Sequence, residues 1–421
     1  MKHRKSSFSS VVALVALAGV ASAGGVHRVG PGRPYATVQA ALDVALDGDL
    51  LLVDYDIYPP FSVAKAVSIV ATNSDFEVAT APGVPAIEVH GIAASRSVTI
   101  VGVVTRYAEP STPAVLVHDN AGAVRFSRLQ ILQDGPLANA ATHAVVQVER
   151  TDTFWLLSAG IAPDGTRFPG NTLNPRGSND GISAVELVDT DAVVHEAVLH
   201  GYDNPAGHGG DGLRAIGDCS VWLRDELVQA IGQTTLRGGD GGPYGGHAVQ
   251  LILPDANENR ITQCRQVHLV PGQGSSADGG YYGINGNSGY NPQHGTWRVP
   301  RLCSGIQVGE TRTEDTVRIG LPLSVRVATP YTSTYVTVVS TGTVYTRAPL
   351  GFKGRGLVDP QAELFRPISF GVKPPATLHF QVDVPPDPAL VGMQLALQTA
   401  FGADGRPIEA LTGPALCVVL P

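Results

Sequence analysis

A short apolar phrase recurs along the first two thirds of the chain, and it constrains the fold more than any other feature. It reads Pro85-Ala-Ile-Glu-Val-His in one copy and Pro113-Ala-Val-Leu-Val-His in the next. Related copies begin at Ala144, Ser183, Gly212 and His247. The copies start 28 to 39 residues apart, and a self-similar phrase at such intervals is typical of repeat architectures, in which each repeat forms one structural unit.

Each copy is followed by polar turns and two further apolar groups. Val98 and Ile100, and then Val103, follow the first copy, while in the fourth copy Val193 stands alone for the second group. Three short strands per copy, each with an inward apolar column, are what stacked coils of a parallel β-helix require, because a coil buries its inner face only against its neighbours. Two-residue hairpin signals are mostly absent, and a propeller or a sandwich is the alternative.

A helical segment precedes the first coil. In Pro34-Tyr-Ala-Thr-Val-Gln-Ala-Ala-Leu-Asp-Val-Ala, the residues Val38, Ala41, Leu42 and Ala45 recur at i, i+3, i+4 and i+7, as on one face of a short helix. The buried-strand pattern Gly48-Asp-Leu-Leu-Leu-Val follows. Because a coil stack leaves an apolar end that needs covering, this pattern predicts an N-terminal helical cap.

The same stretch resembles the opening of the pectin-lyase-like superfamily, which includes pectin methylesterases and many other secreted proteins. The segment from Tyr58, Tyr-Pro-Pro-Phe-Ser-Val-Ala-Lys-Ala-Val-Ser-Ile-Val-Ala, is similar to the second coil of that family. The resemblance covers about residues 27 to 290 and implies a right-handed parallel β-helix. It implies no particular activity, since one fold serves many functions.

From about Val299 the phrase stops and shorter alternating segments take over, such as Leu323-Ser-Val-Arg-Val and Tyr335-Val-Thr-Val-Val. They predict a small antiparallel β-sandwich. The run that begins Val382-Asp-Val-Pro-Pro-Asp-Pro resembles a C-terminal module of secreted planctomycete proteins, which implies packing, attachment or display. We therefore expect an all-β chain with three parts: a signal peptide (1–23), a β-helix domain with glycine-rich insertions (24–298) and a β-sandwich-like domain (299–421).

The first 23 residues have the three-part pattern of a secretory signal. Lys2, Arg4 and Lys5 precede an apolar run from Val11 to Val20, and Ala21-Ser-Ala ends it. This run is about half of the roughly 20 residues that a membrane-spanning helix needs. The sequence therefore predicts a secreted protein, extracellular or at the cell surface, with no membrane span.

The charge of the expected mature chain excludes a nucleic-acid partner. Cleavage would leave 26 Lys and Arg against 37 Asp and Glu, a net charge of −11. Binding to phosphates requires a concentrated basic surface, which this composition does not provide.

Four cysteines in a chain bound for an oxidising compartment favour disulfides over metal binding. Among the three possible pairings, we expect Cys219 with Cys264 and Cys303 with Cys417. No zinc spacing is present, and we expect no metal or other cofactor. Calcium binding by the glycine–aspartate loops is a lesser alternative, because Arg214 and Pro243 stand where the calcium repeat needs a second aspartate.

Outward positions on the coils hold the candidate site residues. On the first strand the outward column reads Glu88, Leu116, Gln147, Glu186, Arg214 and Gln250. The weak catalytic candidates are Glu186, Asp211, Arg214, Arg224 and Asp225, and the candidates for contact with a glycan are Trp155, His195 and Trp222. Such charges can equally be structural cross-strand pairs. His90 and His118 occupy the same place in neighbouring copies and predict a ladder.

The sequence thus favours an extracellular or cell-surface protein that contacts polysaccharide or a cell-envelope component without catalysis. The alternative is a polysaccharide lyase or glycoside hydrolase that acts on acidic polysaccharide along the β-helix. The motifs of pectin methylesterases cannot be placed, and of the polygalacturonase motifs only Gly207-His-Gly is present. A purely structural role, with the coils as a rigid spacer, also fits.

Overall fold

The chain, seen here as a computed structural model, divides into two compact units: residues 25–305, and residues 306–421 together with 1–24. The structure describes residues 12–13, 24–107, 112–133, 143–157, 160–161, 182–195, 197–202, 209–224, 235–240, 246–252, 261–263, 268–270, 301–302, 310–313, 315–329, 333–341, 343–347, 355–358, 365–373, 377–403, 406–408, 410–412 and 415–421. The predicted domain boundary at 298–299, and the predicted signal peptide except Val12 and Ala13, lie outside these residues.

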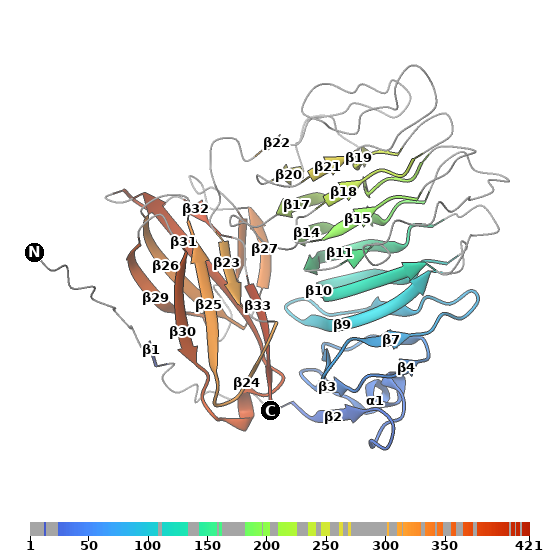
Figure 1. Ribbon diagram of the computed structural model, residues 1–421, viewed down its shortest axis with the longest axis horizontal. Coiled ribbons are helices and arrows are strands. Elements are labelled where there is room, and N and C mark those ends of the chain that lie inside the picture. Colours follow the sequence, from blue (N-terminus) through green and yellow to red (C-terminus); the bar gives the residue numbers. More distant parts are fainter. Residues whose placement is uncertain are drawn as a thin grey trace, which may run out of the picture. The chain divides into compact units, whose positions relative to one another are not determined.

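Residues 25–305 hold a long stack of strands in which the pairings between consecutive coils are parallel (Figure 1). The pairings form three ladders, and the long strands β9, β10 and β11 take part in more than one. The first ladder consists of β5 (Phe61–Val63), β8 (Ile87–His90), β10 (Val115–Gln133), β11 (Val146–Leu157), β13 (Val185–Val188), β16 (Leu213–Ile216) and β19 (Val249–Ile252).

The second ladder consists of β2 (Val26–Val29), β3 (Leu50–Val53), β6 (Ser68–Ala71), β9 (Ser97–Tyr107), β10, β11, β14 (Asp191–His195), β17 (Ser220–Arg224), β20 (Ile261–Gln263) and β22 (Arg301–Leu302). The third consists of β4 (Ile57–Tyr58), β7 (Phe76–Val78), β9, β10, β12 (Gly160–Ile161), β15 (Val198–His200), β18 (Thr235–Arg237) and β21 (His268–Val270). This parallel architecture fits a β-helix.

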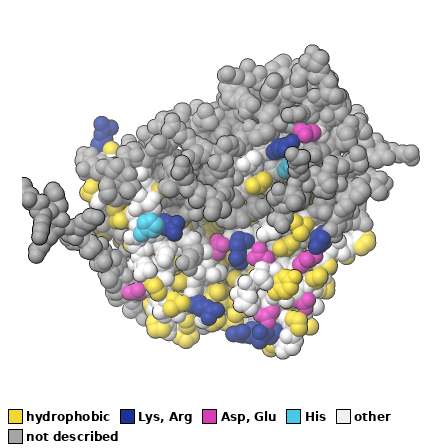
Figure 2. Space-filling model, in the orientation of Figure 1, with side chains coloured by type: hydrophobic (Ala, Val, Ile, Leu, Met, Phe, Trp, Pro, Cys, Tyr) yellow, Lys and Arg dark blue, Asp and Glu magenta, His cyan; other side chains and the backbone are white. Residues whose placement is uncertain are grey.

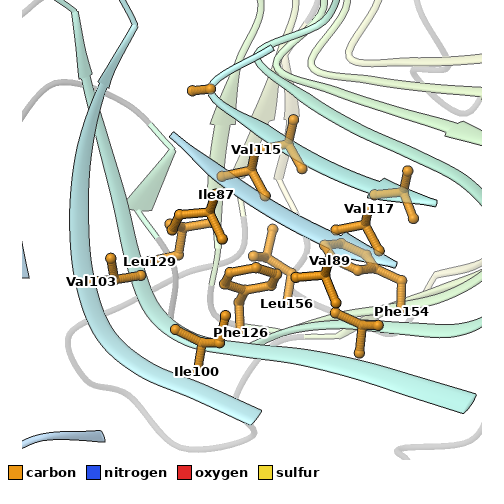
Figure 3. Close-up of a cluster of buried hydrophobic side chains, with 14 of the residues drawn as sticks. Ile87, Val89, Ile100, Val103, Val115, Val117, Phe126, Leu129, Phe154 and Leu156 are labelled. Atoms are coloured by element: carbon orange, nitrogen blue, oxygen red, sulfur yellow. The ribbon is translucent and has the colours of Figure 1, made fainter. Parts of the chain in front are cut away.

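The apolar residues of the repeated phrase form continuous columns inside the stack. Ile87 pairs in register with Val115, and Val115 with Val146, and all three are fully buried. Figure 3 shows side chains of all three ladders, such as Ile87, Ile100 and Val103, pointing toward one another. Burying one such side chain stabilises the fold by about 1.5–3 kcal/mol, so the repeat itself supplies the core.

A column of left-handed residues turns the chain from the first ladder to the second. Gly91, Asp119, Arg150 and Asp189 have φ of +70°, +54°, +44° and +47°. The residue after each of them is hydrogen-bonded to its counterpart on a neighbouring coil. Asn120 makes the most of these hydrogen bonds. Its side chain accepts a hydrogen bond from the Ile92 amide (3.0 Å) and donates to the carbonyl oxygens of His118 (2.9 Å) and Val89 (3.3 Å) and to the Thr151 hydroxyl (3.2 Å).

The helix that the apolar periodicity predicts is present as α1 (Val38–Val44). It begins after Thr37, whose side chain accepts a hydrogen bond from the Ala40 amide, as an N-cap does. The four predicted inner residues, Val38, Ala41, Leu42 and Ala45, are all buried, and they belong to the same apolar cluster as the coil interior.

The second unit contains two sheets that are mostly antiparallel. One has the order β1 (Val12–Ala13), β30 (Leu378–Asp383), β25 (Pro322–Ala328) and β23 (Glu310–Thr313). The other has the order β24 (Thr316–Arg318), β33 (Ala415–Leu420), β31 (Gln394–Ala403), β26 (Ser333–Ser340) and β29 (Phe365–Lys373), and β32 (Ala410–Leu411) pairs with β31. A separate pair, β27 (Thr343–Arg347) and β28 (Arg355–Val358), and a turn of 3-10 helix, η1 (Pro388–Leu390), complete the described elements. Side chains of both sheets, such as Val325 and Leu397, share one buried cluster.

Cys219 differs from the sequence-based expectation, because it is a buried free thiol and not half of a disulfide with Cys264. Its sulfur donates to the Ile216 carbonyl oxygen (3.1 Å) and accepts from the Thr190 amide (3.5 Å). The register explains the difference: Gln263, the residue before Cys264, pairs with Leu223, four residues beyond Cys219. Four residues of strand span about 13 Å, whereas the α-carbons of a disulfide lie within about 7 Å.

Of the other cysteines, Cys417 is buried on β33. Its sulfur is not part of a disulfide, so the expected pairing of Cys303 with Cys417 is not formed either; Cys264 and Cys303 themselves lie outside the described residues.

No helix among the described residues is long and apolar enough to cross a membrane. On the face drawn in Figure 2, the described Lys and Arg side chains are interspersed with Asp and Glu and do not gather into one basic patch.

Candidate functional site

The outward side chains of the first ladder form one continuous row, as the repeated phrase predicts. Leu116 pairs in register with Glu88 on one side and with Gln147 on the other. The register then runs through Glu186 and Arg214 to Gln250. The predicted outward column is therefore confirmed position by position. We call these six residues the outward row.

On the second ladder, the outward column of β11, β14 and β17 is buried. Trp155, Val193 and Trp222 occupy one outward column there and are at most 1% exposed. Arg125 precedes them in the same column, where its guanidinium lies over the Trp155 ring at 5.6 Å and burial lowers its pKa to about 9. Trp155 and Trp222, predicted to stack on sugar rings, are thus both fully buried, and a buried ring exposes no face for such stacking.

The remaining candidates on this ladder stand apart from the outward row. His195 pairs with Arg224 at the ends of strands β14 and β17 of the second ladder. Asp225 lies outside the described residues. Of the five catalytic candidates, the structure thus brings Glu186, Asp211 and Arg214 together at the first ladder and places Arg224 on another ladder.

The lower part of the outward row is satisfied by partners within the protein. Glu88 accepts from His118 Nε2 (3.2 Å), and Asp119 lies at 2.9 Å from His118 Nδ1. Arg150 donates to Asp119 (2.6 Å) and to Glu149 (3.0 Å). These three carboxylates and two basic side chains form a cross-coil network of ion pairs, so this end of the row is held by contacts within the protein.

Gln147, the next residue in the row, is also held. Its side chain contacts His143 Nδ1 (3.1 Å) and donates to Glu149 (2.6 Å). This amide therefore has a donor and an acceptor from its own coil.

Glu186 and Arg214 follow in the row, and they differ from the residues below them. The Glu186 carboxylate and the Arg214 guanidinium are 18% and 29% exposed, and their nearest charged atoms, Oε2 and Nη1, are 3.7 Å apart. This is an ion pair whose separation exceeds hydrogen-bond distance. Neither side chain makes a hydrogen bond to any described residue, and Arg214 Nε is buried. Buried polar groups normally have hydrogen-bond partners, so among the described residues this pair differs from the rest of the outward row.

Gln250 completes the upper part of the row beside Arg214. It is 8% exposed, and within the described ranges its amide also has no hydrogen-bond partner. We call Glu186, Arg214 and Gln250 the open trio. Glu186 offers an anionic hydrogen-bond acceptor, Arg214 offers a cationic donor, and the neutral amide of Gln250 can donate and accept.

The electrostatics of the open trio centre on Glu186. Burial raises the pKa of its carboxyl above the usual value. The positive charge of Arg214 opposes this rise, whereas the carboxylates of Glu149 and Asp211 add to it. The group is therefore a carboxylate that burial has made easier to protonate.

Asp211 and His247 form a second pair beside the open trio, just before β16 and β19. Asp211 Oδ1 accepts from the His247 backbone amide (2.8 Å) and lies 3.0 Å from His247 Nδ1. This contact fixes the ring orientation of His247 and favours a hydrogen on Nδ1. His247 and His143 could not be predicted as site residues, because both lie before the strands, outside the alternating pattern.

Glycine backbones pack closely at these same turns. Gly246 donates to the Gly239 carbonyl oxygen, and Gly239 donates to that of Gly210, both at 2.8 Å. A β-carbon on Gly239 would lie 1.9 Å from the Tyr202 oxygen, and one on Gly246 would lie 1.9 Å from the Gly210 oxygen. At these positions the glycine-rich insertions are part of the packed stack.

No group of three or more His, Cys, Asp or Glu among the described residues is arranged to hold a metal ion. Comparison with known proteins gives no assignment either. No protein-family model, curated protein or solved structure matches the chain. The function must therefore be argued from the site.

Proposed function

We propose that this chain is a secreted protein that binds polysaccharide along the outward row of its first ladder, outside the cell or at its surface. In this proposal residues 25–305 form a right-handed parallel β-helix of the pectin-lyase-like type, and α1 caps its first coil. The two sheets of the second unit form a sandwich that packs against or attaches to a cell-envelope component.

The observation that carries the proposal is the ion pair between Glu186 and Arg214. Two mostly buried charges pay a desolvation cost that their 3.7 Å separation recovers only in part. Groups held in this way gain most from a ligand rich in hydroxyl groups, because each hydroxyl can donate to the carboxylate and accept from the guanidinium. Polysaccharide is the extracellular polymer that presents such groups in a regular series.

The arrangement of the row supports an extended ligand. Neighbouring coils are about 4.8 Å apart, so the three steps from Gln147 to Gln250 span roughly 14 Å. A linear polymer that lies along the row would contact each coil in turn, and the rigid stack would hold these contacts in a fixed geometry.

A second candidate function is acid–base cleavage of the same polymer. It is favoured by the raised pKa of Glu186 and by the Asp211–His247 pair next to it. A buried carboxyl with a raised pKa is a suitable group for general acid–base chemistry. Release of reducing ends or of unsaturated sugars on prolonged incubation would favour this candidate over binding alone.

The proposal is tested by a panel of immobilised polysaccharides probed with the wild-type protein, Arg214→Gln and Arg106→Gln. Arg106 is the matched control, because it also pairs with a glutamate of the preceding coil, but at 2.7 Å from Glu77 and on the third ladder. We expect Arg214→Gln to lose roughly tenfold or more in affinity, the value of a hydrogen bond to a charged group. Binding to no polysaccharide, or equal loss in both variants, would overturn the proposal.

A further inference from the structure

The charges around the open trio define which class of polysaccharide can bind there. Arg214 is the one permanent cation among the described groups that act on Glu186. Glu186 is itself a carboxylate, and the carboxylates of Glu149 and Asp211 act on it electrostatically. Any anionic group that approached Arg214 would therefore also approach Glu186.

Resting on the proposed function, we infer that the open trio binds a neutral, polyhydroxylated glycan and discriminates against sugars that carry a carboxylate or sulfate. The inference stands on the separation and the opposite charges of Glu186 and Arg214, with Gln250 beside them.

The geometry of the pair suits a hydroxyl group. With Oε2 and Nη1 3.7 Å apart, one oxygen can lie within about 2.8 Å of both atoms. A hydroxyl at that point accepts from Arg214 and donates to Glu186 in the same pose. It thereby supplies the hydrogen bonds that both groups lack among the described residues.

A carboxylate cannot do the same. When ionised it only accepts hydrogen bonds, so it would satisfy Arg214 and leave Glu186 facing a like charge. Burial raises the pKa of Glu186, which means that burial already disfavours its charged form. The negative charge of an anionic sugar beside it would disfavour that charged form further. Gln250, which is uncharged, adds a donor and an acceptor that suit a further hydroxyl.

The test uses pairs of oligosaccharides that differ in one functional group. Each neutral oligosaccharide is compared with its own form oxidised at C6 to the uronate, by calorimetry at pH 7.5 with the full chain. We expect the wild-type protein to bind the neutral member about tenfold or more tightly than the uronate. Glu186→Gln should remove most of this preference, because the amide keeps the size of the side chain and loses its charge.

Glu77→Gln is the matched control, since Glu77 is ion-paired with Arg106 across coils of the third ladder; it should leave the preference unchanged. Tighter binding of the uronate by the wild-type protein would overturn the inference and leave polysaccharide binding standing. An unchanged preference in Glu186→Gln, with an unchanged melting temperature, would also overturn it. Failure of both members of every pair to bind would overturn the proposed function itself.

Discussion

His118 stacks on His90 across consecutive coils, with ring centroids 5.4 Å apart and an angle of 15° between the ring planes. Both nitrogens of His118 face carboxylate oxygens, those of Glu88 and Asp119. A neutral imidazole has a single N–H, so only the protonated ring can donate to both. When His118 is protonated, the histidine ladder is a charged ring between two carboxylates, stacked on a second ring that is hydrogen-bonded to Ser62.

The first prediction concerns the pH dependence of stability. Burial lowers the pKa of His118, but its hydrogen bonds with Asp119 and Glu88 outweigh burial and raise it above the usual value. A raised folded-state pKa stabilises the fold fully below the unfolded pKa, about 6.5, and this contribution is lost as pH rises through the folded value. We expect the melting-temperature gap between wild type and His118→Gln to shrink as pH rises from 6 to 9. A gap that is constant across this range would contradict a charged His118.

The second prediction concerns the packed glycines. Gly239→Ala places a β-carbon 1.9 Å from a backbone oxygen, which no side-chain adjustment can relieve. We expect the free energy of unfolding to fall by about 3 kcal/mol or more, measured by urea denaturation. The control is Gly32→Ala, where φ is +71° but the space is open, and where the loss should stay near 1–2 kcal/mol. Equal losses would show that backbone strain, and not close packing, selects glycine here.

The third prediction concerns the buried amide of Asn120. Asn120→Ala leaves the Ile92 amide and the Val89 carbonyl oxygen without this partner inside the stack. We expect a loss of about 1–3 kcal/mol in the free energy of unfolding. Asn73, an exposed asparagine of the same unit, serves as the comparison, and Asn73→Ala should change stability by less than about 0.5 kcal/mol. Similar losses of unfolding free energy in the two variants would mean that the Asn120 side chain does not stabilise the turns between the first and second ladders.

The fourth prediction concerns Cys219. Burial raises the pKa of its thiol to about 11, so very little reactive thiolate is present at pH 8. We expect iodoacetamide to leave Cys219 unmodified in the native protein and to alkylate it once urea unfolds the chain, as read by peptide mass. Recovery of Cys219 in a disulfide-linked peptide with Cys264 would contradict the thiol seen here.

The outward row could be predicted from the sequence because the phrase fixes its own register. Once Glu88 and Leu116 are aligned by the phrase, Glu186 and Arg214 follow by counting copies, and a parallel stack keeps aligned residues as neighbours. The same alternation predicts that Trp155 points outward. It does not predict whether other residues cover the ring, so the burial of Trp155 could not be predicted from the sequence.

Two further differences have local causes. Val193 was expected to face inward, but it lies in the outward column while Ala192 and Val194 face the core. A run of apolar residues has no alternation by which to choose a side. His247 was missed because its contact with Asp211 joins turns of consecutive coils, where no periodic pattern exists.

The central claim, that a glycan lies on Glu186 and Arg214, is tested most directly by protection of Arg214 in the unmodified protein. An arginine-specific reagent such as phenylglyoxal is applied with and without saturating glycan, and its rates at Arg214 and Arg106 are read from the same digest. The two arginines are 29% and 37% exposed, so both can react. The account predicts that glycan slows modification of Arg214 several-fold and leaves Arg106 unchanged, since a bound sugar would occupy the guanidinium. Modification of Arg214 at the same rate with and without bound glycan would contradict it.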